Sequence, residues 1–142
     1  IKKSFENISK KKISMNSENS KEELYIKRKA EITYGLRNFI GNASKFSDSK
    51  IEIKLESNEK QTRIIVSDDG PGFPDDIKNF LGEPYIHSKN KKINAKSGLE
   101  LGTFIGKTLL ERMKANVNFG KCPNLKGAKV TIEWETKKLL TI

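Results

Sequence analysis

The chain has 142 residues and a net charge of +10, with 28 Lys and Arg against 18 Asp and Glu. This length suits one domain with a buried core, and 35% hydrophobic residues places the chain with folded rather than disordered proteins. A single cysteine excludes an internal disulfide, one cysteine with one histidine excludes a His/Cys zinc cluster, and no apolar run approaches the ~18 residues of a membrane span.

Most of the excess positive charge lies in two segments. Residues 1–29 contain nine Lys and Arg and four Glu, and residues 89–96 contain four Lys and no acidic residue. Neither segment shows apolar periodicity, so we interpret them as a linker and a loop rather than as a nucleic-acid-binding face. We therefore expect residues 1–25 to be a linker, residues 26–142 to be one folded domain, and nucleic acid not to be a partner.

The first predicted element is an amphipathic helix over about residues 32–46. Apolar residues recur there at steps of three and four, which places them on one face of a helix. Asn38, Asn42 and Lys45 are spaced at i, i+4 and i+7, so they share another face.

Two strands follow. Apolar residues alternate over residues 51–55, and a second apolar run lies within residues 63–68. Asn58-Glu59-Lys60 between them is typical of a turn, so the two strands are predicted to pair as a hairpin. The second strand ends in Asp68-Asp69-Gly70-Pro71-Gly72.

The rest of the chain continues to alternate helices and strands. A short helix is predicted to begin near Pro74, and residues 85–98 have the Lys, Asn, Ser and Gly content of a long loop. Apolar spacing predicts a helix over residues 101–113, opened by a glycine-bearing turn, and two final strands over residues 117–119 and 128–134. Helices interleaved with adjacent antiparallel strands indicate a two-layer α/β sandwich.

The carboxylate of Asp68 is the first candidate for ligand binding. An ionised carboxylate only accepts hydrogen bonds, so it suits the exocyclic amino group of adenine and repels the carbonyl group of guanine. Glycines at the start of a helix allow backbone N–H groups to face phosphate. Lysines in a mobile loop can close on a triphosphate, and the candidates are Lys89, Lys91, Lys92 and Lys96.

Three ordered segments resemble the motifs of sensor histidine kinases. Residues 38–46 look like the N box of that family, residues 68–72 like its G1 box and residues 98–102 like its G2 box. The resemblance runs from about residue 26 to residue 134. Each glycine motif alone is weak, whereas the ordered set is specific.

Two further segments, residues 81–85 and 104–112, are similar to the Reg/Prr-type redox-responsive regulatory kinases of alphaproteobacteria. The resemblance implies a Bergerat ATP-binding fold, a two-layer α/β sandwich whose mixed, mostly antiparallel sheet of about five strands carries about three helices on one face. Residues 26–142 are then the catalytic ATP-binding domain, and residues 1–25 the linker from an upstream acceptor-helix domain.

The resemblance also implies which residues bind ATP and Mg²⁺. Asn42 would present its amide oxygen to the metal, Asp68 would bind adenine, and Phe73 would pack near the ring. The other ATP-binding residues that it implies are Asn38, Lys45, Gly70, Gly72, Lys89, Gly98, Leu101 and Gly102.

Asn38 decides which reaction is expected. Related ATPases and serine kinases carry a Glu, able to act as general base, one helical turn before the Mg-binding Asn, and here that position holds Asn38. An amide takes no proton at neutral pH, whereas imidazole is already nucleophilic near its pKa of about 6.5. The sequence therefore favours phosphoryl transfer to a histidine over transfer to water or serine.

The acceptor histidine is expected outside this chain. His87, the only histidine, lacks the acidic neighbour and downstream Pro of the family's acceptor helix, so we interpret it as a lid residue. The expected partners are the protein's own dimerisation and histidine-acceptor domain and a response-regulator receiver domain. No catalytic residue beyond those positioning ATP is expected here, nor is turnover by this chain alone. The expected location is the cytoplasmic side of a bacterial inner-membrane sensor protein.

Glu100 departs from the family pattern, which has glycine at this position of the G2 box. A positive φ would cost Glu about 1–2 kcal/mol, and a carboxylate some 5 Å from a phosphate charge adds roughly 3 kcal/mol of repulsion at an effective dielectric near 20. The alternative is therefore a nucleotide-silent, kinase-like interaction domain. Cys122 lies in a predicted turn, away from the redox cysteine of the Reg/Prr kinases, so redox sensing is not carried over.

Overall fold

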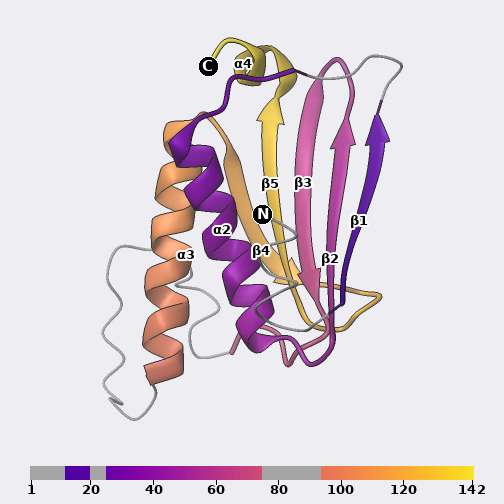
Figure 1. Ribbon diagram of the computed structural model, residues 1–142, viewed down its shortest axis with the longest axis vertical. Helices are drawn as coiled ribbons and strands as arrows, with labels where there is room; N and C mark the ends of the chain where they lie inside the picture. Colours follow the sequence, from indigo (N-terminus) through magenta and orange to yellow (C-terminus); the bar gives the residue numbers. More distant parts are fainter. Residues whose placement is uncertain (1–11, 20–24, 75–93) are drawn as a thin grey trace.

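The computed structural model describes residues 12–19, 25–74 and 94–142, and within these it shows two layers (Figure 1). The strands are β1 (Lys12–Asn19), β2 (Lys50–Ser57), β3 (Gln61–Asp68), β4 (Asn116–Lys121) and β5 (Ala128–Glu135). The helices are α2 (Ala30–Phe46), α3 (Asn94–Arg112) and α4 (Thr136–Leu140). Within this described part of the chain, no helix has the length and apolar character needed to cross a membrane.

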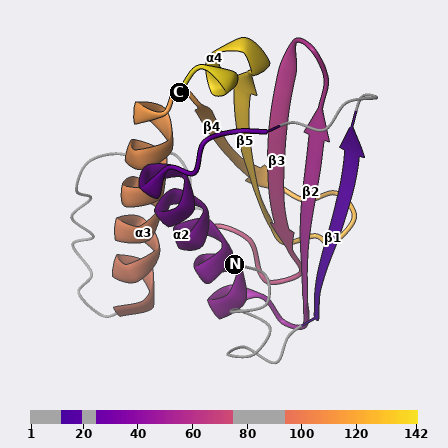
Figure 2. The ribbon, with the colours of Figure 1, turned by 45° about the horizontal axis from the view of Figure 1, so that its top comes forward.

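The five strands form one mixed sheet in the order β1-β2-β3-β5-β4. β1 pairs with β2 in parallel, and the other neighbouring strands are antiparallel. Figure 2 shows α2 and α3 side by side over one face of this sheet. The predicted two-layer α/β sandwich is therefore confirmed. The short helix expected after Pro74 falls on residues 75–93, outside the described residues.

The expectation of a linker over residues 1–25 is wrong for residues 12–19, which form β1. Ile13 is 3% exposed and belongs to a core cluster with Ile40 and Ala43 of α2. It pairs with Ile51, 38 positions along the chain. Local composition carries no signal for such a parallel, long-range pairing, and the lysines around it are typical of an edge strand as well as of a linker.

The apolar face predicted for α2 packs against the sheet. Ile32, Phe39, Ile40 and Ala43 are buried, and Phe39 belongs to the same cluster as Trp134 of β5. Phe39 and Trp134 are each 1% exposed, and burial of such a side chain stabilises the fold by about 1.5–3 kcal/mol. This packing fixes the C-terminal half of α2 over β3 and β5.

Glycines allow α2 and α3 to approach closely. A Cβ atom at Gly106 would lie 2.9 Å from the Phe39 ring, and one at Gly102 would lie 3.2 Å from Oδ1 of Asn42. At the other end of the same seam, Gly35 of α2 faces Leu110. The seam places the N-box-like face of α2 directly against α3.

The start of α3 differs from the prediction. We expected a loop up to residue 98 and a turn over residues 98–102, whereas α3 begins at Asn94 and contains Gly98, Glu100 and Gly102. No proline occurs between Pro84 and Pro123, and Ala, Lys, Leu and Glu in this segment are strong helix formers. Their propensity outweighs the two glycines, Gly98 and Gly102, that we interpreted as a turn before the helix.

Candidate functional site

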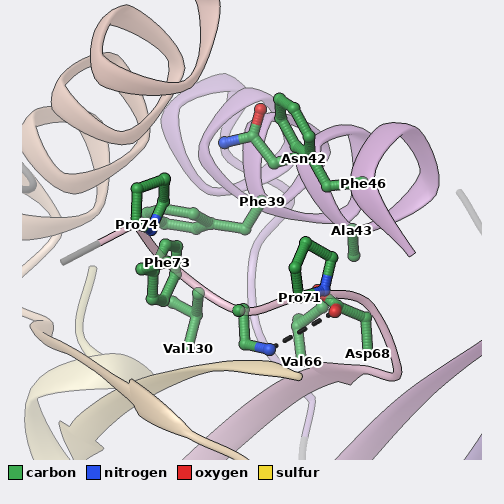
Figure 3. A pocket seen from close by; sticks show the side chains of 12 residues that line it. Phe39, Asn42, Ala43, Phe46, Val66, Asp68, Pro71, Phe73, Pro74 and Val130 are labelled. Atoms are coloured by element: carbon green, nitrogen blue, oxygen red, sulfur yellow. Dashed lines mark hydrogen bonds between the residues drawn. The ribbon is translucent and has the colours of Figure 1, made fainter. Parts of the chain in front are cut away.

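A pocket lies between the C-terminal half of α2 and the segment that follows β3 (Figure 3). Its lining residues are Phe39, Asn42, Ala43, Phe46, Val66, Asp68, Pro71, Gly72, Phe73, Pro74, Ala128 and Val130. The side chains are apolar except those of Asn42 and Asp68. An apolar pocket with a few placed polar groups suits a flat heterocyclic ligand.

Asp68 is the last residue of β3 and is 4% exposed. Its Oδ1 accepts hydrogen bonds from the backbone N–H groups of Gly70, at 2.9 Å, and Ala128, at 3.3 Å. Gly127 packs so closely against Asp68 that a Cβ atom there would overlap its backbone carbonyl oxygen and its Oδ1. The carboxylate is thus fixed within the pocket by the strand end and by β5.

Gly70 and Gly72 have different roles in the turn after β3. A Cβ atom at Gly70 would overlap the carbonyl oxygen of Phe46, so this glycine lets the turn pass beneath the end of α2. Gly72 lines the pocket and has a φ of +80°, which L residues with side chains rarely adopt. The two glycines therefore shape this part of the pocket wall, and their role in admitting the ring stays a prediction.

An aromatic cluster supports this wall. Phe73 lies edge-on to Phe119 with ring centroids 5.7 Å apart, and Phe119 contacts Phe39 in the same manner at 5.8 Å. Edge-to-face pairs of this kind add about 0.5–1.5 kcal/mol beyond area burial. The sequence did not single out Phe119, because its strand is distant from the motif in the chain.

Asn42 enters the pocket from α2, with its amide against Gly102 of α3. Its Nδ2 is buried and finds no hydrogen-bond partner among the described residues. A buried amide group without a partner is costly, by about 1–3 kcal/mol, unless a ligand or water supplies one. Rotation of the Asn42 amide by 180° exchanges Oδ1 and Nδ2, so either atom can face such a ligand.

The two neighbours of Asn42 on the helix lie outside the pocket lining. Asn38 is half-buried near Gly106, and its Nδ2 donates to the Tyr34 carbonyl oxygen at 2.8 Å. Lys45 is exposed, and its Nζ lies 5.4 Å from the ring centroid of Phe46. Lys45 is therefore within reach of the pocket rim through Phe46.

The residues expected to surround the phosphates are only partly described. Leu101 is 57% exposed and lies outside the pocket lining, whereas Gly102 contacts Asn42. Gly98 and Glu100 lie within α3, so Glu100 has helical backbone and no positive-φ penalty arises for it. Of the expected lid residues, His87, Lys89, Lys91 and Lys92 lie outside the described residues, whereas Lys96 lies within α3 rather than in a loop.

Asp69 was not predicted as part of the site, although its carboxylate accepts several hydrogen bonds beside the pocket. Its carboxylate accepts from the backbone N–H groups of Asp48, Ser49 and Lys50 and from Oγ of Ser49. Desolvation acts to raise the pKa of Asp69, but these hydrogen bonds outweigh it and hold the pKa well below its usual range. The only feature of the sequence that could have indicated this role is that Asp69 is a second Asp directly before Gly70.

No group of three or more His, Cys, Asp or Glu residues is gathered for a metal within the described ranges. A divalent cation in this pocket would depend on the Asn42 amide oxygen together with oxygens of its ligand and water. That arrangement suits Mg²⁺, which keeps several waters and is often bound through substrate phosphates.

The fold, the strand-terminal carboxylate and the glycine turn define an α/β sandwich with a nucleotide-type pocket. The chain belongs to the family of histidine kinase-, DNA gyrase B- and HSP90-like ATPases, whose sequence profile matches residues 28–138. The resemblance inferred from the three motifs is thereby confirmed.

Individual proteins point to the sensor kinases within this family. Sensor histidine kinase RegB of Cereibacter sphaeroides is 32% identical over 132 residues, covering 82% of this chain but only 29% of RegB. The nucleotide-free catalytic domain of histidine kinase ThkA has a TM-score of 0.71 at 19% identity, covering 94% of this chain and 85% of that one. Full-length ShkA, in complex with AMPPNP, has a TM-score of 0.65 at 23% identity, covering 94% of this chain and 28% of that one.

Proposed function

We propose that this domain binds Mg-ATP and donates its γ-phosphoryl group to a histidine on an upstream dimerisation helix, for relay to an aspartate of a response regulator. The observation that carries the proposal is the buried carboxylate of Asp68, held by two backbone N–H groups inside an apolar pocket. The AMPPNP complex of the structurally similar ShkA and the identity to RegB support the same assignment.

The residues in and around the pocket have separate roles in this proposal. Asp68 accepts a hydrogen bond from the adenine amino group, and Phe73 and Gly72 form the wall beside the ring. Asn42 would hold Mg²⁺ with its amide oxygen, and a metal there would supply charge neutralisation for the phosphates. Lys45, near the rim, offers positive charge to phosphate oxygens. The contributions of Lys89, Gly98, Leu101 and Gly102 to binding are part of the proposal.

A histidine acceptor fits the environment of Asn38. Its amide donates to the backbone of its own helix and has no proton-accepting nitrogen to activate water or serine. Transfer to an imidazole requires less help, because positioning and electrostatics supply most of the catalysis of phosphoryl transfer. Hydrolysis by this chain alone is accordingly expected to be slow.

The wider context is also a proposal. Residues 26–142, together with β1, form the catalytic domain of a sensor protein of the bacterial inner membrane, and the domain lies on the cytoplasmic side. Its partners are the histidine-acceptor domain and the receiver domain, and nucleic acid is not one of them. The competing function, a nucleotide-silent docking domain, rests on Glu100, which stands where the G2 box of the family has glycine.

Phosphotransfer in trans tests this proposal. The chain is mixed with Mg-ATP labelled at the γ-phosphate and with a separately produced dimerisation and acceptor domain of a RegB-type kinase. We expect label on the acceptor histidine, and no label when Asp68→Asn replaces the unmodified chain. Nucleotide binding without any transfer would refute the kinase assignment, and absence of binding would favour the silent domain.

A further inference from the structure

One carboxylate joins the two walls of the pocket. Oδ1 of Asp69 accepts from the N–H groups of Asp48, Ser49 and Lys50, each at 3.0 Å. Oδ2 accepts from Oγ of Ser49 at 2.8 Å and from its N–H at 3.2 Å. The N–H of Asp69 donates in turn to the carbonyl oxygen of Lys50 at 3.2 Å. We call this set of bonds the Asp69 clamp.

The clamp holds the turn that ends α2. Ser47, the C-cap, donates its N–H to the carbonyl oxygen of Ala43, and the turn continues through Asp48 and Ser49 into β2. Asn42 and Phe46 lie in the last turns of α2 and line the pocket on that side. Asp68 lies on the other side, one residue before Asp69.

Steric contact leaves little freedom between the two walls. Gly70 follows the clamp directly, and its Cα lies so close to the Phe46 carbonyl oxygen that a Cβ atom would overlap it. Movement of the turn at residues 47–49 would therefore shift Phe46 and Asn42 relative to Asp68. A ligand that contacts both walls is sensitive to such a shift, because a site misplaced by about 1 Å loses much of its function.

We propose that Asp69 is a positioning residue for the nucleotide: through the turn at Asp48–Lys50 it fixes the distance across the pocket between Asn42 and Asp68. The inference rests on the proposed nucleotide-binding function and adds a residue that does not touch the ligand. In this proposal Asp68 contacts adenine, and the adjacent Asp69 sets the width of the pocket.

Asp69→Asn tests the clamp with almost no change in size. The amide keeps one oxygen for the backbone N–H groups, but its NH2 group replaces Oδ2, which accepts from Oγ and N–H of Ser49 in the unmodified chain. Ser49→Ala removes only the side-chain contact. Glu59→Gln, an exposed residue in the turn between β2 and β3, is the control that removes the same charge far from the pocket.

Affinities for a fluorescent ATP analogue and for adenosine are measured on each variant, at a temperature where circular dichroism shows it fully folded. We expect Asp69→Asn to weaken the ATP analogue about tenfold or more and adenosine less, because only the analogue spans both walls. Ser49→Ala should have a smaller effect, Glu59→Gln none, and the double variant should bind no more weakly than Asp69→Asn alone.

Two results would overturn the inference separately. If the unmodified chain binds neither ligand, the proposed function fails and the clamp has no nucleotide to position. If the unmodified chain binds both, and folded Asp69→Asn binds both equally well while only its stability falls, the nucleotide site stands and Asp69 is merely structural. Independent, additive effects of Asp69→Asn and Ser49→Ala would also contradict action through the turn.

Discussion

Gly70→Ala adds one methyl group where the turn after β3 packs closely against the end of α2. The new Cβ atom would overlap the carbonyl oxygen of Phe46 and lie 3.0 Å from its carbonyl carbon. Both are backbone atoms of α2, so no side-chain rotation relieves the clash. Gly70 is not among the described glycines with positive φ, and the cost therefore comes from steric overlap rather than from backbone conformation.

The expected loss is about 1–3 kcal/mol in the free energy of unfolding, the usual cost of forcing extra volume into a packed site. Gly120→Ala is the matched control, because a Cβ atom on Gly120 in β4 meets nothing within 4 Å. At such a site Gly→Ala stabilises by about 0.4–1 kcal/mol through the unfolded state. Urea unfolding followed by the fluorescence of Trp134, the single and buried tryptophan, measures both variants.

The pocket provides a second readout of the same change. Since the methyl group pushes α2 away from the turn after β3, Gly70→Ala should also weaken binding of a fluorescent ATP analogue, whereas Gly120→Ala should not. If the two variants have equal unfolding free energies and equal affinities, the close packing of the turn beneath α2 is wrong.

Four further outcomes are expected. Asp68→Asn keeps an oxygen for Gly70 and Ala128 but loses the charge, so the chain should bind ATP more weakly with nearly unchanged melting temperature; melting of the domain with normal binding would make Asp68 structural. Asn42→Ala should remove the Mg²⁺ dependence of ATP binding, measured by titration with and without the metal. Folding lowers the pKa of Asp69, so the stabilisation by its carboxylate is complete above the unfolded pKa of about 3.9 and is lost as pH falls below that value. The urea midpoint should therefore drop less steeply in acid for Asp69→Asn than for the unmodified chain. Glu100→Gly should raise ATP affinity less than about tenfold in an active kinase, whereas a gain of two or more decades would identify a silent domain. Because Glu100 has helical backbone, Glu100→Gln, which removes only the charge, should give the same result as Glu100→Gly if repulsion is the cause.

Local sequence patterns predicted the helices and strands that can be recognised without knowing which element they pack against. The apolar spacing of α2 and the alternation in β2 and β5 each reflect one buried face, and that periodicity can be seen in consecutive residues. β1 was missed because Ile13 is buried by a parallel strand far along the chain. The early start of α3 was missed because Gly98 and Gly102 indicated a turn, whereas the helix formers around them favour a helix.

Sequence reasoning could identify a candidate site residue where the residue type and its position in the chain alone suggest a chemical role. Asp68, at a strand end before glycines, was singled out from its type and position, and it lines the same pocket as Asn42. Asp69 and Gly127 were not found, because their importance comes from the end of α2 and the start of β5, segments that only folding brings together. Leu101 was included through the motif that contains it; it is exposed and is not among the residues that line the pocket.

Nucleotide selectivity of the unmodified chain tests the central claim most directly. The chain is titrated with fluorescent analogues of ATP and of GTP, both with Mg²⁺, by fluorescence anisotropy. A buried carboxylate at Asp68 that only accepts hydrogen bonds predicts saturable ATP binding and at least about tenfold weaker GTP binding, a difference of ~1.4 kcal/mol. Equal affinity for the two nucleotides, or no binding of either, would contradict the assignment of this pocket to adenine.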